Sequence, residues 1–179
     1  MNRIKILEKE FEEFIPQARI QEVISDMAVK INNDLAGREV IFMGILNGAF
    51  MFASDLYRQI SLDCQITFLK LASYSGTSST GNVKRLIGIN EDIKSKTVVI
   101  LEDIVDTGIT LENIIKQLSG YEPTEVRIAT LLFKPEAYLR DIHLDYIGLE
   151  IPNDYIVGYG LDYKGYARNL VHIYREVAS

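Results

Sequence analysis

The chain alternates between segments whose apolar residues recur at helical spacing and short segments that are apolar throughout. In residues 17–36 the apolar side chains fall three and four positions apart, which predicts a helix with one buried stripe, ended by Gly37. Residues 40–46 read VIFMGIL, a run typical of a strand that helices cover on both faces. This alternation predicts an α/β fold with a parallel sheet.

The rest of the chain continues the pattern. Further helices are expected at residues 49–60 and 111–118, and further strands at residues 65–72, 97–101, 126–133, 146–150 and 155–161. Residues 163–179 lack clear periodicity, and we expect them to lie over the edge of the sheet. A length of 179 residues with 47% hydrophobic composition suits a single domain, 1–179, whose core needs neither disulfides nor structural metal.

Composition narrows the class of protein. The 19 Lys and Arg residues against 25 Asp and Glu give a net charge of −6, which opposes binding to nucleic acid. The single cysteine, Cys64, cannot close an internal disulfide and indicates a reducing compartment. The charged first residues lack the apolar core of a signal peptide, and no apolar run approaches the ~20 residues that span a bilayer. We therefore expect a cytoplasmic protein that binds neither nucleic acid nor membranes.

One long polar stretch interrupts the alternation. Residues 73–85 read SYSGTSSTGNVKR and offer almost nothing to bury. A loop of this length inside a compact domain is typical of a lid or a binding loop, although a merely floppy hairpin has the same composition. We expect a mobile loop here.

Residues 98–110 read VVILEDIVDTGIT, in which an apolar strand runs directly into Glu102 and Asp103 and then into a turn. Ligands of open α/β sheets bind beyond the carboxyl ends of the strands, so we expect both acids there. The next helix begins at the same place, and its free N–H groups and dipole would cradle a phosphate at residues 106–110.

The side chains of this turn support the same interpretation. Thr107 and Thr110 add hydroxyl donors, and Gly108 allows a close approach of the backbone. Two acids beside an anion require a cation or sugar hydroxyls, which predicts a phosphorylated ribose with Mg²⁺. An acidic first turn on an ordinary helix would give the same spacing.

The segment resembles the phosphoribosyl pyrophosphate signature of the type I phosphoribosyltransferases. Further segments resemble the hypoxanthine-guanine branch of that family: LNG at residues 46–48, SY at 73–74, Lys134, GLEIPNDYIVGYGLDY at 148–163, and Arg168. The resemblance covers nearly the whole chain. It implies the type I phosphoribosyltransferase fold, a mostly parallel twisted sheet flanked by helices, with a small hood built from approximately residues 140–179 and N-terminal residues.

The resemblance implies a Mg²⁺-dependent transfer of 5-phosphoribose from phosphoribosyl pyrophosphate to N9 of hypoxanthine or guanine, in a homodimer or homotetramer. Glu102 and Asp103 would hold the ribose hydroxyls and metal, and the turn residues Asp106, Thr107, Gly108 and Thr110 would hold the 5′-phosphate. Asp106 is implied as general base toward the purine, although a simple turn-former would suit the same position.

The purine contacts are also implied by the resemblance. Lys134 would donate to the 6-oxo group, which favours oxopurines over adenine, whereas a structural interpretation has Lys134 extend into solvent. Tyr155 would stack on the base, Ile104 would pack on its other face, and the Ile156 carbonyl would accept a hydrogen bond. Any of these three could instead be core residues.

The pyrophosphate contacts are implied at the turn Leu46, Asn47 and Gly48, with Arg168 as guanidinium partner and Asp162 placing a second Mg²⁺. Ser73 and Tyr74 would form the root of a closing lid. The family often carries Lys or Arg where this chain has Asn47, and it often has a cis peptide bond here, which we expect between Leu46 and Asn47.

Three alternatives remain open from the sequence. Xanthine could be the main substrate, because sequence does not place the backbone carbonyls that read the 2-position. A regulatory protein could retain the phosphoribosyl pocket without catalysis, but it would not need Asp106, Lys134 and Arg168 together. A receiver domain with Asp103 at a strand end would leave the DTGIT turn without a role.

Overall fold

The computed structural model describes residues 2–74, 83–87 and 91–177, and for residues 71–74 and 83–87 it describes the backbone alone. Its main layer is a six-stranded sheet with the order β5-β4-β3-β6-β7-β8. The strands are β3 (Val40–Leu46), β4 (Cys64–Tyr74), β5 (Val83–Ile87), β6 (Thr97–Val105), β7 (Glu125–Phe133) and β8 (Tyr146–Glu150). All pair in parallel except β5, which is antiparallel to β4. The expected α/β architecture with a mostly parallel sheet is confirmed.

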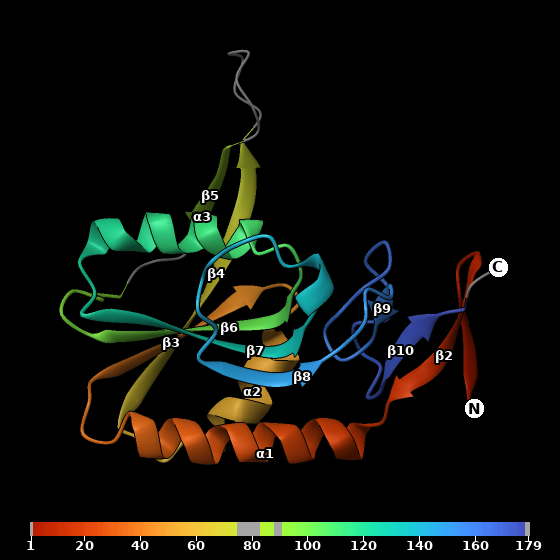
Figure 1. Cartoon of the computed structure of the whole chain (residues 1–179), viewed down its shortest axis with the longest axis horizontal. Helices are drawn as coiled ribbons and strands as arrows, with labels where there is room; N and C mark the ends of the chain where they lie inside the picture. Colours follow the sequence, from red (N-terminus) through yellow and green to blue (C-terminus); the bar gives the residue numbers. More distant parts are fainter. Residues whose placement is uncertain (1, 75–82, 88–90, 178–179) are drawn as a thin grey trace.

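Helices cover both faces of this sheet (Figure 1). Helices α1 (Gln17–Asp34) and α2 (Phe50–Tyr57) pack on one face, and α3 (Ile109–Leu118) packs on the other. Alternate strand residues divide between the two cores: Val99 and Leu101 face α1 and α2, whereas Val98 and Ile100 face α3. Strands covered in this way must be apolar throughout, which explains the continuous apolar runs in the sequence. Two single-turn 3₁₀ helices, η1 (Ser119–Tyr121) and η2 (Pro135–Ala137), complete the helical elements among the described residues.

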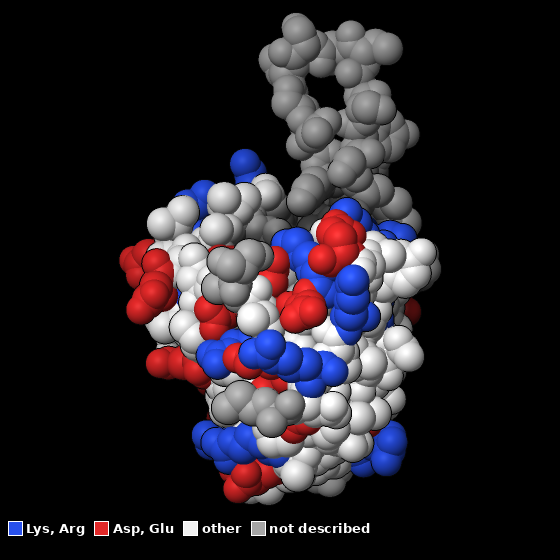
Figure 2. All heavy atoms as spheres, turned by 90° about the vertical axis from the view of Figure 1, so that its right-hand side faces the viewer, with Lys and Arg blue, Asp and Glu red and all other residues white. Residues whose placement is uncertain are grey.

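A second, antiparallel sheet lies at one end of the molecule (Figure 1). Its order is β1-β2-β10-β9, formed by β1 (Arg3–Ile6), β2 (Lys9–Ile15), β10 (Ile173–Glu176) and β9 (Ile156–Val157). It therefore joins the first residues of the chain to the last. On the face shown in Figure 2, positive and negative side chains alternate over the part that the structure describes. The four-stranded sheet and its adjoining turn carry the ion pairs Lys9–Glu176, Lys164–Glu8 and Arg175–Glu12.

Several expected boundaries are wrong. The strand expected at residues 155–161 is confined to Ile156–Val157, because Gly158, Tyr159 and Gly160 adopt positive φ angles of 99°, 49° and 98° and turn the chain. Residues 163–179 contain β10, which was not predicted because a strand of this short length and mixed polarity shows no periodic pattern. The expected helix 49–60 ends at Tyr57, and α3 begins two residues before its expected start. No helix among the described residues is long and apolar enough to cross a membrane.

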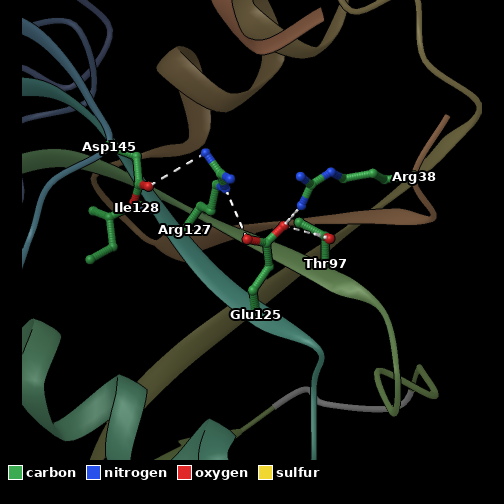
Figure 3. A network of polar contacts seen from close by, with 6 residues as sticks. All are labelled: Arg38, Thr97, Glu125, Arg127, Ile128 and Asp145. Carbon is green, nitrogen blue, oxygen red and sulfur yellow. Dashed lines mark hydrogen bonds and ion pairs between the residues drawn. The ribbon is translucent and has the colours of Figure 1, made fainter. Parts of the chain in front are cut away.

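The amino ends of β6, β7 and β8 are joined by a polar network (Figure 3). The Glu125 carboxylate accepts hydrogen bonds from the Thr97 hydroxyl at 3.0 Å and from Arg127 Nε at 3.2 Å, and it pairs with Arg38. Arg127 also lies 3.7 Å from the Asp145 carboxylate. Burial alone would raise the pKa of Glu125, but the Thr97 and Arg127 contacts outweigh it and lower the pKa. This network holds the strand register at the end of the sheet opposite to the Glu102–Asp103 pair.

Candidate active site

The acid pair lies within the last residues of β6. The strand continues to pair with β7 as far as Val105, so Glu102 and Asp103 are strand residues rather than the loop residues we expected. Glu102 is 7% exposed, and no ion pair reaches its carboxylate from the part of the chain that the structure describes. Burial and then the neighbouring Asp103 charge raise the pKa of Glu102 well above its ordinary value. A buried acid in this state favours a ligand that brings a cation or hydroxyl donors.

Asp103 lies directly against the turn formed by residues 46–48. A Cβ atom at Gly48 would lie 1.8 Å from Asp103 Oδ2, so only glycine allows this contact. Burial raises the pKa of Asp103 to about 6, although the Ile104 N–H donates to Oδ1 at 3.0 Å and opposes the shift. The peptide bond between Leu46 and Asn47 is cis, as the family resemblance implied.

A cleft of about 320 Å³ opens at the carboxyl end of β6. Its lining residues are Ile45, Leu46, Gly48, Glu102, Asp103, Ile104, Val105, Asp106, Thr107, Gly108, Thr110 and Leu111. The first turn of α3 borders this cleft. The first N–H groups of a helix have no acceptor inside the helix itself, so these groups are free to bind a ligand. Gly108 has a φ of 79° and packs so closely on Tyr138 that a Cβ would lie 2.6 Å from the ring. The cleft therefore combines acids on one side with a helix N-terminus suited to an anion on the other.

Lys134, directly after β7, contacts Asp106 at the border of this cleft. It is 7% exposed, and its Nζ lies 3.6 Å from Asp106 Oδ2 and 3.4 Å from Asn153 Oδ1. The alternative in which Lys134 extends into solvent is therefore wrong. The Lys134 N–H also donates to the Val105 carbonyl at 3.0 Å, which fixes the end of β7 beside the Asp106 turn.

The segment after β8 brings a second group of expected site residues. Tyr155 is 46% exposed, and its hydroxyl donates to the Asp162 carbonyl at 3.1 Å. The Asp162 carboxylate lies 2.5 Å from Arg168 Nη2. The charge of Arg168 lowers the pKa of Asp103 and that of Asp162 raises it, so both charges act at the acid pair. The segment that carries Asp162 and Arg168 therefore lies close to the acid pair at the end of β6.

Not every expected residue joins these groups. Asn47 is exposed and does not line the cleft, and the Ile156 side chain is a core residue of β9, although its proposed role used only the backbone. Ser73 and Tyr74 end β4, paired with Lys84 and Val83, so the expected loop is strand at both of its ends. The tip of that loop, residues 75–82, lies outside the described residues.

Two residues that contact the site or its supporting turn were not predicted from the sequence. Asn153, which contacts Lys134, stands beside Asp154 in a short polar stretch between Ile151 and Tyr155, a weak signal. Tyr159 is 2% exposed and connects the turn after β9 to α2 through Asp55. The two flanking glycines in GYG were the available signal, because a large residue between glycines indicates a turn packed tightly on its neighbours.

The carboxylates suit a hard cation but do not form a complete protein cage. Among the residues that the structure describes, no group of three or more His, Cys, Asp or Glu side chains could hold a metal ion. Glu102, Asp103 and Asp162 supply the oxygen donors that Mg²⁺ prefers, and Mg²⁺ in phosphate-transfer sites takes most of its ligands from substrate and water. The donor set therefore fits a magnesium ion that arrives with a phosphorylated substrate.

Comparisons with known proteins agree with this geometry. The family model described as phosphoribosyl transferase domain matches residues 12–164. The hypoxanthine-guanine phosphoribosyltransferase of Staphylococcus aureus (strain N315) is 37% identical over 163 residues, covering 90% of this chain and 91% of the relative. Its counterpart from Staphylococcus epidermidis (strain ATCC 12228 / FDA PCI 1200) is 41% identical over 155 residues, covering 86% and 87%. A crystal structure of a hypoxanthine-guanine phosphoribosyltransferase from Bacillus anthracis superposes with a TM-score of 0.84 at 34% identity, covering 93% of this chain and 97% of that chain.

Proposed function

The chain belongs to the phosphoribosyl transferase family, and from this premise we propose how its residues divide the work. It is a hypoxanthine/guanine phosphoribosyltransferase of purine salvage: it transfers 5-phosphoribose from phosphoribosyl pyrophosphate to N9 of the base and releases pyrophosphate. In this reaction N9 forms a bond to C1′ of the ribose, and the bond from C1′ to the pyrophosphate oxygen breaks. The electron pair leaves with pyrophosphate, and the purine loses a ring proton.

The phosphoribose is assigned to the cleft at the end of β6. The 5′-phosphate is held by the N–H groups and hydroxyls of residues 106–110, where the helix dipole favours negative charge. Glu102 and Asp103 accept hydrogen bonds from the ribose hydroxyls. This assignment is supported by the position of both acids in the cleft and the burial of Glu102, since hydroxyl donors would stabilise the charged form of a buried acid.

Asp106 and Lys134 are assigned to the purine. The Asp106 carboxylate accepts the proton that the purine loses, and the Lys134 ammonium donates to the 6-oxo group. Tyr155 stacks on the base, Ile104 packs against it, and the Ile156 carbonyl accepts a further hydrogen bond. The observation that carries the proposal is the 3.6 Å contact between Lys134 and Asp106, because it brings a buried donor and a base together at the phosphate turn.

The leaving group is assigned to the turn of residues 46–48 and to Arg168, with one Mg²⁺ at Glu102 and Asp103 and a second Mg²⁺ at Asp162. When bound, the metal neutralises charge on the pyrophosphate oxygens. The Arg168 guanidinium adds to this from the protein side, and its position beside Asp162 supports the assignment. Ser73 and Tyr74 are assigned to the root of a lid that keeps water from the reacting ribose.

The test is a spectrophotometric assay of hypoxanthine, guanine, xanthine and adenine with phosphoribosyl pyrophosphate, with and without EDTA. We expect turnover of hypoxanthine and guanine, no turnover of adenine, and loss of activity in EDTA that excess Mg²⁺ restores. Nucleotide binding without turnover of any base would instead support a regulatory protein. We also propose a cytoplasmic homodimer or homotetramer, which sedimentation equilibrium and cell fractionation would check.

A further inference from the structure

We propose that Tyr159 is a positioning residue for the pyrophosphate end of the site. Its buried hydroxyl fastens the turn that holds Arg168 to helix α2, which follows directly from the turn of residues 46–48. The inference rests on the proposed function, which assigns these two groups to pyrophosphate.

The Tyr159 hydroxyl is part of a junction between three segments. It donates to Asp55 Oδ2 at 2.7 Å, and Gln21 Nε2 donates to the same oxygen at 2.7 Å. Asp55 lies on α2 and Gln21 on α1, so one carboxylate joins both helices to the turn after β9. Tyr159 is 2% exposed, and a hydrogen bond to a charged group in such surroundings is stronger than an exposed one.

The turn around Tyr159 leaves no room for adjustment. Gly158 and Gly160 have φ angles of 99° and 98°, and a Cβ on Gly158 would lie 2.2 Å from the His172 carbonyl oxygen. A Cβ on Gly160 would lie 2.1 Å from the Gly48 carbonyl oxygen. Gly160 therefore packs directly on the turn of residues 46–48, and Gly48 in turn packs on Asp103.

The same turn holds Arg168 by both its side chain and its backbone. Arg168 Nη1 donates to the Gly160 carbonyl at 2.7 Å, and the Gly160 N–H donates to the Arg168 carbonyl at 2.9 Å. The residue next to Gly160 is Tyr159, so a displacement of Tyr159 moves the acceptor of the Arg168 guanidinium. Lys134, Asn153 and Asp106 share no contact with this junction in the described structure, so the proposed donor and base of the purine end do not depend on it directly. The Tyr155 side chain is linked to it through its hydrogen bond to the Asp162 carbonyl.

The position of the hydroxyl predicts a selective defect. The variant Tyr159→Phe keeps the ring in its pocket and removes only the bond to Asp55. We expect the KM for phosphoribosyl pyrophosphate and the Kd for magnesium pyrophosphate to rise roughly 5- to 20-fold, as loss of one buried charge-assisted hydrogen bond permits. The KM for hypoxanthine should change less than about twofold, because a packing defect that spread through the fold would affect both substrates.

The matched control is Tyr57→Phe, which removes a partly buried tyrosine hydroxyl from α2, the helix that carries Asp55. Tyr57 donates to the Cys64 carbonyl at 3.0 Å, away from the cleft. We expect both KM values of this variant to equal those of the wild type. Equal KM values in Tyr159→Phe and the wild type, or equal increases for both substrates, would overturn the positioning role. Wild-type protein without turnover would instead overturn the proposed function.

A double-mutant cycle with Asp55→Ala keeps the test decisive if either variant is destabilised. If Tyr159 acts through Asp55, the double variant should raise the KM for phosphoribosyl pyrophosphate no further than Asp55→Ala alone does. Additive increases would show that the two residues act separately and would contradict the proposal. Thermal melts and circular dichroism of all variants establish that the measured proteins are folded.

Discussion

The ammonium of Lys134 lies 3.6 Å from the carboxylate of Asp106 and 3.4 Å from the amide oxygen of Asn153. Lys134 comes from the end of β7, Asp106 from the turn before α3, and Asn153 from the segment after β8. Three parts of the chain thus converge on one buried cation, which pairs with the residue proposed as general base. In the proposed reaction, a purine that accepts from Lys134 and donates to Asp106 would replace this pairing with two hydrogen bonds of its own.

Lys134→Met should weaken the binding of oxopurines. The variant keeps the length of the side chain and removes the donor to the 6-oxo group, so we expect the KM for hypoxanthine to rise about 10- to 100-fold. The KM for phosphoribosyl pyrophosphate should change little. Initial-rate kinetics with each substrate varied in turn measure both values. Lys116→Met removes an exposed lysine from α3 and serves as the control. An unchanged KM for hypoxanthine would contradict the proposed hydrogen bond between Lys134 and the 6-oxo group.

Asp106→Asn should slow the chemical step. The amide keeps the size and most of the hydrogen bonding of the carboxylate but cannot accept the purine proton, so we expect kcat to fall roughly 10²- to 10⁴-fold. Thermal stability should change little, because Asp106 is partly exposed. Single-turnover rates and a thermal melt measure the two effects, with the exposed Asp141→Asn as control. Near-normal turnover would count against Asp106 as the base.

Asp103→Asn should stabilise the ligand-free protein at neutral pH. Burial raises the pKa of Asp103 from 3.8 to about 6 in the folded state, so the folded protein binds this proton more tightly than the unfolded chain. The contribution of the carboxyl to stability is complete below pH 3.8 and is lost as the pH rises through 6. We therefore expect the variant to melt about 2–5 °C higher at pH 7.5, with the difference disappearing near pH 4.

Melting curves between pH 4 and 8 check this, with the exposed Asp63→Asn as control. A difference between the variant and the wild type that does not depend on pH would contradict the assignment. Addition of magnesium and phosphoribosyl pyrophosphate should reverse the order of stability, because the ligands stabilise only the charged Asp103.

Glu125→Gln should destabilise the protein, with the opposite dependence on pH. The Thr97 hydroxyl and Arg127 lower the pKa of Glu125 below its ordinary 4.5, so its contribution is present above pH 4.5 and is lost as the pH falls through the folded-state value. We expect a loss of about 1 kcal/mol in the free energy of unfolding at pH 7, since the network is partly exposed. Urea titrations at pH 7 and pH 3.5 measure it, with Glu10→Gln as control. A loss of equal size at both pH values would assign the effect to packing.

The central fold follows from the sequence because its signals are local. The stripe of α1 and the apolar run of β3 each show within one element which faces are buried. The strands of the second sheet do not: β1 reads RIKI and β10 reads IYRE, so half of the residues in each are charged. β1 is a strand through its pairing with β2, and β10 through its pairing with β2 at the other end of the chain. The reversal after Val157 depends on positive φ angles that no periodicity reveals.

The residues of the candidate site also fall into a group that the sequence predicts and a group that it does not. The acid pair, the phosphate turn and Lys134 each stand at the end of an apolar strand, so their order along a parallel sheet predicts where they lie. Asn153 and Tyr159 could not be found in this way, because Asn153 contacts a residue 19 positions away and Tyr159 contacts one 104 positions away. Contacts of this kind follow from the folded arrangement of the second sheet on the first.

Asn47→Lys should strengthen binding of the pyrophosphate group. Asn47 is exposed and uncharged within the turn of residues 46–48, which is proposed to hold the pyrophosphate. A charge near a phosphate anion contributes about 1 kcal/mol in water at 4 Å, so we expect the KM for phosphoribosyl pyrophosphate to fall roughly 3- to 10-fold at low ionic strength. The gain should shrink in 0.5 M salt, because exposed charges are screened. Asn33→Lys adds the same charge on exposed α1 and should leave the KM unchanged. Equal KM values in the two variants at low salt would remove the turn from the pyrophosphate site.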